Sequence, residues 1–133
     1  MYQIGEMFKT PIFAWTSSQT KANVFSAVFS GCMKLTKLCG DQAEWSQATF
    51  GDDSERGPVG PLKHLALEAV EAQENPKDLA EYADCFLLIL DASRRAGYSI
   101  GDLIEGAVQK QSANEKRTWP KPTGDTPVFH NKE

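Results

Sequence analysis

Asn75-Pro76 is the feature that most restricts the fold, because it separates two stretches of helical character. A proline disfavours the helical conformation of the residue before it and has the φ angle of a first helical turn. We therefore expect one helix over residues 62–74 and a second over residues 77–96, with Gly97 ending the second. Because the connection is so short, the two helices are predicted to form a hairpin.

The chain before this hairpin also carries helical patterns. Residues 21–38 have apolar side chains at a spacing of about 3.6 residues, and Gly40 is expected to end that helix. A short helix over residues 41–50 is predicted next, because Asp41 opens the pattern of a capping box. Residues 51–61 are rich in glycine and proline and should form a loop.

The chain after the hairpin predicts one more helix and a tail. Ser99 and Asp102 have the spacing of a capping box, and the apolar residues that follow recur at i, i+3, i+4 and i+7. From Trp119 onward, three prolines favour extended chain. The expected fold class is all-α, in a single domain with three parts. These are a divergent N-terminal segment with one helix (1–40), a helical core (41–118) and an extended tail (119–133).

Composition excludes several classes of protein. The net charge of -4 offers no basic field to nucleic-acid phosphates, so we expect no nucleic-acid partner. The longest apolar run, residues 85–90, is far shorter than the ~20 residues of a membrane span, and the N-terminus lacks a signal-peptide pattern. The three cysteines favour reduced thiols. A cytoplasmic protein without a membrane partner is the expectation.

Two pairs of acidic residues lie at helical spacing, one on each arm of the hairpin. Glu68 and Glu71 project from one face of the first helix, and Glu81 and Asp84 do the same on the second. A pair of this kind is, by itself, more often a solvated helix face. The second pair differs, because residues 79–90 are otherwise almost entirely apolar and predict a central, buried helix.

Burial of these carboxylates would require a cation. An unpaired buried carboxylate costs several kcal/mol. Arg94 and Arg95 are expected to pair with Asp91, which leaves Glu81 and Asp84 without an obvious partner nearby in the sequence. A set of ligands made of carboxylate oxygens selects Mg²⁺, or Mn²⁺, over Zn²⁺. We therefore expect four carboxylates to hold a divalent metal.

Two neighbours of the first acidic pair are left out of this set. His64 lies one turn before Glu68, and a packed or hydrogen-bonded histidine is the better interpretation than a metal ligand. Glu74 lies one further step along the same face, at the end of the helix, where solvation is expected.

Basic and aromatic residues are candidates to bind a substrate. Lys110, Asn114 and Arg117 form one stripe on the last helix, suited to phosphate oxygens. The alternative, a solvated basic end of a helix, has equal weight on spacing alone. Three aromatic side chains are candidates to stack on a base, and a packing role stays open for each: Trp45, Phe50 and Trp119.

Residues 41–130 resemble the MazG-like all-α nucleoside triphosphate pyrophosphohydrolases, most closely the dATP/dGTP diphosphohydrolase branch with its many phage-encoded members. The motifs that carry the resemblance are Trp45…Phe50-Gly51, Arg56-Gly57-Pro58, His64-Leu65-x-x-Glu68-x-x-Glu71, Glu81-x-x-Asp84 and Lys110-x-x-x-Asn114-x-x-Arg117-x-Trp119-Pro120. The resemblance implies a helical bundle that assembles into a dimer or tetramer. It also implies Mg²⁺ held by the residues that match the family's acidic positions, which are Glu68, Glu71, Glu81 and Asp84.

The function that we expect is the Mg²⁺-dependent conversion of dGTP or dATP to the monophosphate and pyrophosphate. Two alternatives stay open. One is a hydrolase of the same fold that removes pyrimidine or modified deoxynucleotides. The other is a non-catalytic helical protein that binds a nucleotide or a partner, with its acidic residues at a structural cation site or facing solvent.

Overall fold

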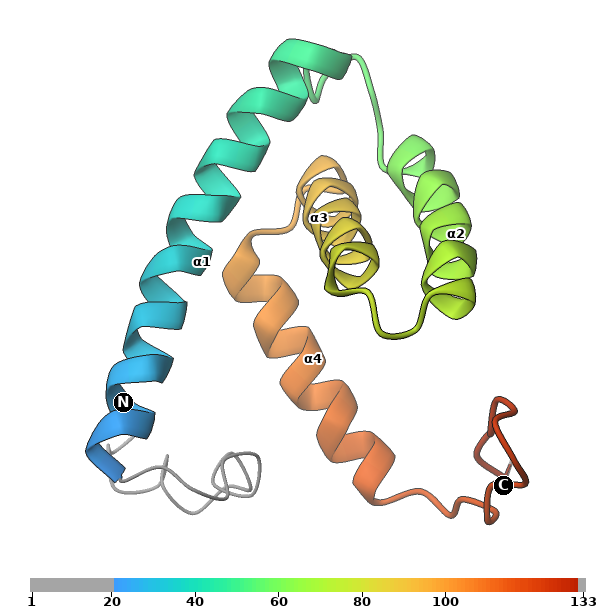
Figure 1. The fold of residues 1–133 in the computed structure, drawn as a ribbon. Helices are drawn as coiled ribbons and strands as arrows, with labels where there is room; N and C mark the ends of the chain where they lie inside the picture. The colour runs from blue at the N-terminus through green and yellow to red at the C-terminus, as the bar shows by residue number, and fades with distance from the viewer. Residues whose placement is uncertain (1–20, 132–133) are drawn as a thin grey trace. The chain divides into compact units, whose positions relative to one another are not determined.

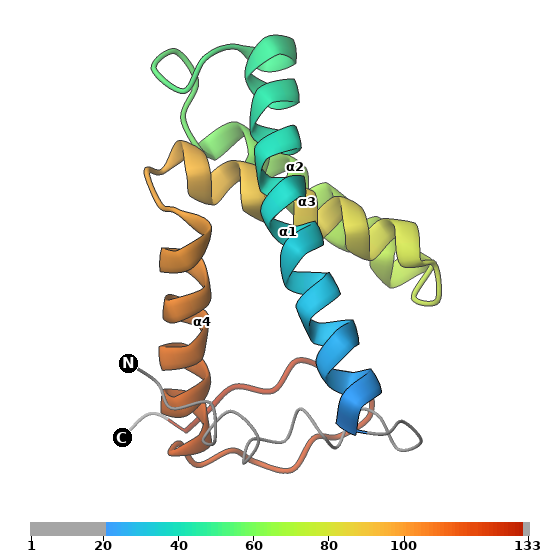
Figure 2. The same ribbon diagram turned by 90° about the vertical axis from the view of Figure 1, so that its left-hand side faces the viewer.

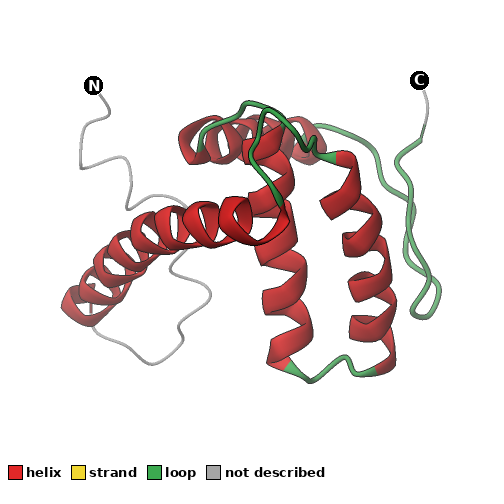
Figure 3. Ribbon diagram, turned by 90° about the horizontal axis from the view of Figure 1, so that it is seen from above, coloured by secondary structure: helices red, strands yellow, loops and turns green. Residues whose placement is uncertain are grey.

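The computed structural model describes residues 21–131, and the side chains of residues 26–131. Within that range the chain has helices and no strand, so the all-α prediction is confirmed (Figure 3). The chain divides into two compact units, Met1–Glu44 and Trp45–Glu133. Residues 1–20 of the expected N-terminal segment lie outside the described range. None of the helices in that range is both long and apolar enough to cross a membrane.

The first helix, α1 (Lys21–Phe50), is a single element, and the predicted break at Gly40 is wrong. Gly40 does not have the positive φ that a helix-ending glycine adopts. The side chain of Asp41 forms an ion pair with Lys37 one turn earlier, instead of capping a new helix. A glycine inside a helix costs about 1 kcal/mol relative to alanine, which the surrounding turns can offset. Gly51, with φ of 103°, follows the true end.

The hairpin consists of α2 (Val59–Glu74) and α3 (Leu79–Arg95), which pack side by side as predicted (Figure 1). At the turn, the backbone N–H of Asn75 donates to the Glu71 carbonyl, and the N–H of Asp78 donates to the Asn75 carbonyl, each at 2.9 Å. The Asp78 side chain accepts from the N–H of Ala80 and so caps α3. Pro76 therefore lies in the turn itself.

Two helix boundaries differ from the predicted ones. Helix α2 begins three residues early, inside the stretch that was expected to be a loop, and Pro61 occupies its first turn. A proline is compatible with that position because the first N–H groups of a helix have no intrahelical acceptor. Helix α3 begins two residues late, because Asp78 supplies the cap.

The last helix, α4 (Ile100–Glu115), begins as the sequence predicts. The Ser99 hydroxyl accepts from the backbone N–H of Asp102, and the Asp102 carboxylate accepts from the N–H of Ser99, so the capping box is complete. Gly97, with φ of 90°, provides the bend between α3 and α4. Residues 117–131 contain neither helix nor strand.

The prediction that α3 is buried along its length is wrong for its first two turns. Leu79 is 80% exposed, Tyr82 52% and Phe86 45%. Burial increases only toward the C-terminal end of the helix, where Leu90 and Ala92 are enclosed. The hairpin alone therefore leaves a large apolar surface uncovered.

Candidate metal centre

Three carboxylates from the two arms of the hairpin come together near the turn. One oxygen each from Glu68, Glu81 and Asp84 lies within 4.8 Å of the other two. The helical spacing brings Glu81 and Asp84 to one face of α3, and the packing of α2 against α3 brings Glu68 opposite them. The juxtaposition predicted from the two acidic pairs is thus present for three of the four residues.

The electrostatics of Glu81 reflect this crowding. Partial burial raises the pKa of the Glu81 carboxyl above its ordinary value. The negative charges of neighbouring carboxylates raise the pKa further, in the order Glu71, Asp78, Glu68 and Asp84. Glu71, although outside the group of three oxygens, is thus close enough to act on Glu81. A positive charge at this place would relieve the repulsion.

The donor set fits a small, hard cation. Ligands of Mg²⁺ lie at about 2.1 Å, so two oxygens on one ion are at most about 4.2 Å apart. Small side-chain rotations would bring the three oxygens from within 4.8 Å to that separation. Glu68 and Glu81 are half-buried and Asp84 is exposed, so the expected deep burial of the second pair is not found. An open site leaves room for water and phosphate oxygens beside the ion.

The two residues left out of the predicted set are now placed. His64 Nε2 lies 2.8 Å from Glu68 Oε1, which orients the Glu68 carboxylate. This contact agrees with a hydrogen-bonded histidine. Glu74 is exposed at the end of α2.

The residues expected to hold phosphates lie on or just beyond α4, which diverges from the hairpin (Figures 1 and 2). Lys110 is exposed on the helix. Arg117 follows the end of α4, and its Nη1 donates to Asn114 Oδ1 at 3.0 Å. In this chain the basic stripe and the acidic cluster therefore do not meet.

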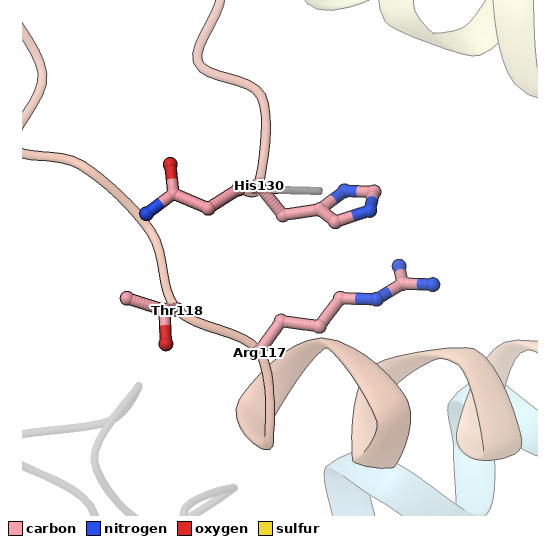
Figure 4. Close-up of a pocket in the computed structure, with 4 residues that line it drawn as sticks. Arg117, Thr118 and His130 are labelled. Carbon is pink, nitrogen blue, oxygen red and sulfur yellow. The ribbon is translucent and has the colours of Figure 1, made fainter. Parts of the chain in front are cut away.

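Residues just after α4 and residues of the tail line a pocket of about 320 Å³ that is open to solvent (Figure 4). Its lining residues are Arg117, Thr118, His130 and Asn131. Neither His130 nor Asn131 belongs to a motif that spacing alone would single out, because they are far from Arg117 in the sequence. Only the return of the tail brings them together.

Comparison with known proteins identifies the family. The family model described as dATP/dGTP pyrophosphohydrolase matches residues 38–133. This chain belongs to the dATP/dGTP pyrophosphohydrolase family. The "Eaa protein" of Salmonella phage P22 is 46% identical over 93 residues, which are 70% of this chain and 28% of that protein. The chain thus spans less than a third of this relative. No solved structure matches.

In this member of the dATP/dGTP pyrophosphohydrolase family, a second polar cluster lies at the other end of α3. The Arg95 side chain is fully buried, and its Nε donates to Asp91 Oδ2 at 3.1 Å. Arg95 Nη2 donates to Ser46 Oγ at 2.9 Å, and that hydroxyl donates to Asp91 Oδ1 at 2.6 Å. The predicted pairing of Arg94 and Arg95 with Asp91 is confirmed, but the part played by Ser46 was not predicted.

This cluster fixes the loop between α1 and α2. Arg95 Nη1 donates to the carbonyl oxygens of Gly51 and Arg56, at 3.2 and 3.1 Å. Arg94 pairs with Asp53 of the same loop. The network therefore connects the C-terminal end of α1, the loop and the end of α3.

Aromatic residues stand beside that loop. The rings of Trp45 and Phe50 meet edge to face with centroids 5.3 Å apart, and the Arg56 guanidinium lies over the Phe50 ring at 5.5 Å. Trp45 remains 58% exposed. It thus has both a packing contact and free surface for a flat ligand.

Proposed function

We propose that this chain hydrolyses a purine deoxynucleoside triphosphate, dATP or dGTP, to the monophosphate and pyrophosphate, with Mg²⁺ as the metal. The observation that carries the proposal is the convergence of Glu68, Glu81 and Asp84 within 4.8 Å, in a chain of the dATP/dGTP pyrophosphohydrolase family. Crowded carboxylates repel one another, and a divalent ion bridging a triphosphate is the ligand that this charge pattern favours.

Each group has a proposed task. Glu68, Glu81 and Asp84 hold the cation, and Glu71 completes the set of four. When bound, Mg²⁺ supplies charge neutralisation at the phosphates and a more acidic water. Addition of water across the phosphoanhydride bond between the α- and β-phosphates yields the monophosphate and pyrophosphate, whether the α- or the β-phosphorus is attacked.

Four more side chains are proposed to bind or position the substrate. Lys110 and Arg117 bind phosphate oxygens, because ammonium and guanidinium groups donate charge-assisted hydrogen bonds. Asn114 orients Arg117 through their 3.0 Å hydrogen bond. Trp45, with its exposed face, stacks on the purine.

We also propose that the active form is a homo-oligomer, a dimer or tetramer. Among the described residues, Leu90 and Ala92 are the buried members of the hydrophobic core. Large apolar side chains stay exposed on α2, α3 and α4: Leu62, Leu67, Val70, Leu79, Tyr82, Phe86, Ile104 and Val108. A surface of this extent on a small helical chain favours association with another copy. The separation of the basic stripe from the acidic cluster is the second support, since a neighbouring copy would supply the missing half.

Pyrophosphate release, measured over a panel of deoxy- and ribonucleoside triphosphates with Mg²⁺ and with EDTA, tests the proposal. We expect turnover of dATP or dGTP that EDTA abolishes. The Asp84→Asn variant should lose at least about 100-fold in rate, because several kcal/mol of metal-derived stabilisation correspond to that factor.

Glu74→Gln is the matched control, since Glu74 lies on the same face of α2 at its exposed end. It should retain wild-type turnover. Preference for a pyrimidine or modified nucleotide would contradict the purine substrate and favour a hydrolase of the same fold that removes such nucleotides. Absence of Mg²⁺-dependent turnover on the whole panel would contradict the enzymatic proposal and favour a non-catalytic binding protein.

A further inference from the structure

The segment after α4 returns to its own starting point. The backbone N–H of Asn131 donates to the Thr118 carbonyl at 3.1 Å, and the rings of Trp119 and His130 meet edge to face with centroids 5.7 Å apart. The Trp119 indole N–H donates to the Asn114 carbonyl at 2.8 Å, which attaches this segment to the last turn of α4. The tail was expected to be extended, but these contacts bring His130 back beside Arg117.

The pocket made by this return is cationic. Figure 4 shows the guanidinium of Arg117 and the imidazole of His130 extending in the same direction from neighbouring stretches of backbone. The bond from Arg117 Nη1 to Asn114 Oδ1 fixes the guanidinium and leaves its other N–H groups available. None of the described residues that line the pocket is acidic. Thr118 and Asn131 are the other two lining residues.

We infer that the C-terminal tail completes a polyphosphate-binding pocket in which His130 and Arg117 together hold phosphate oxygens. Arginine presents a planar set of donors that matches an oxyanion, and the imidazole adds a ring N–H donor at its side. A pocket of about 320 Å³ is large enough for more than one phosphate group. The natural ligand would be the phosphates of the substrate or the pyrophosphate product, and this assignment rests on the proposed function.

Binding of inorganic tripolyphosphate to the full chain in EDTA tests the pocket without the metal site. Calorimetry gives the affinity, and NMR of the histidine ring protons shows where the anion binds. We expect tripolyphosphate to shift the His130 signals. His130→Ala and Arg117→Gln should each weaken binding by about tenfold or more, the factor that corresponds to one charge-assisted hydrogen bond.

Lys121→Ala is the matched control, because Lys121 is a cation of the same tail that does not line the pocket. It should bind like the wild type, and all variants should keep the wild-type circular dichroism and melting temperature. No binding by the wild type, equal binding by His130→Ala, or an equal loss in Lys121→Ala would overturn the inference.

Turnover separates this inference from the proposed function. If dATP or dGTP is hydrolysed, His130→Ala should raise KM more than it lowers kcat, because the residue binds phosphate rather than the metal. Tripolyphosphate binding without turnover of any nucleotide would sustain the pocket and contradict the enzymatic proposal. Turnover with an unchanged KM in His130→Ala would sustain the enzyme and contradict binding of the substrate's phosphates in this pocket.

Discussion

Arg95 shows how much one residue contributes when its partners come from three segments. Its side chain is fully buried and donates to Asp91, to Ser46 and to the carbonyl of Gly51, among other acceptors. A backbone carbonyl that is shielded from water needs a hydrogen-bond donor from the protein, because leaving it unpaired costs free energy. Arg95 therefore supplies hydrogen bonds to the loop carbonyls, and the loop in turn helps to shield the Arg95–Asp91 ion pair from solvent.

Replacement of Arg95 by Met should destabilise the fold by about 3 kcal/mol, because it leaves Asp91 and the loop carbonyls without their buried donor. Arg94 continues to pair with Asp91, which sets the loss at the lower end of the usual range for a broken buried pair. Urea unfolding followed by circular dichroism measures the change. Lys63→Met, at an exposed position of α2, is the control and should stay within about 0.5 kcal/mol. A loss in Arg95→Met no larger than in this control would mean that the network contributes little.

At the scale of the element, the question for α1 is whether Gly40 lies inside the helix or ends it. Inside a continuous helix Gly40→Ala should stabilise the chain by about 0.5–1 kcal/mol, since alanine loses less entropy on folding and its Cβ would meet nothing within 4 Å. Gly97→Ala is the contrasting variant, because φ of 90° is unfavourable for alanine, and it should destabilise. Melting temperatures of the two variants decide the matter. Destabilisation by Gly40→Ala would restore the break predicted there.

The capping box of α4 makes a prediction about pH. The side-chain hydrogen bond with Ser99, followed by the backbone one, lowers the pKa of Asp102 below its ordinary value. The ionised form is therefore favoured by the folded state, and its contribution is present above the unfolded pKa of about 3.9 and lost as the pH falls through the lower folded pKa. Asp102→Asn should thus lower the melting temperature at pH 7. The difference from the wild type should shrink as the pH falls toward 2.

Melting curves recorded across this pH range provide the measurement. Asp125→Asn, in the exposed tail, removes the same charge away from any helix N-terminus and should leave the pH dependence unchanged. A difference between Asp102→Asn and the wild type that persists at the lowest pH would assign the effect to the shape of the side chain instead of its charge.

At the scale of the whole molecule, the question is whether one copy holds a complete site. The proposal of a shared site predicts complementation between two inactive variants, Asp84→Asn and Arg117→Gln. In a mixed dimer, one site receives the intact acidic cluster of one chain and the intact Arg117 of the other. Random 1:1 mixing makes half of the dimers mixed, with one active site of two, so about a quarter of the wild-type activity should return.

The mixture must be unfolded and refolded together so that the subunits exchange, and each variant refolded alone is the control. Sedimentation of the wild type under the same conditions establishes that an oligomer is present. No activity in a mixture that demonstrably contains mixed oligomers would place both groups in the same chain and contradict the shared site.

The amino-acid sequence by itself determined the features that depend on neighbours along the chain. Asn75 and Pro76 mark the hairpin, Ser99 and Asp102 mark the start of α4, and the three-residue spacing places Glu81 beside Asp84. All of these follow from hydrogen bonds and helix geometry within a few residues. The all-α class follows from the same local patterns.

Only the tertiary structure decided which helix is continuous, which apolar side chains are buried and which residues distant in sequence come into contact. The local sequence around Gly40 predicts a helix end, yet α1 continues through it. The free-energy cost of a glycine inside a helix is smaller than the stabilisation from the turns on either side. The apolar run of α3 predicts burial, yet its first turns stay exposed, because burial depends on which surfaces pack against them. Ser46 with Arg95, and His130 with Arg117, lie far apart in sequence, so no periodicity encodes their proximity.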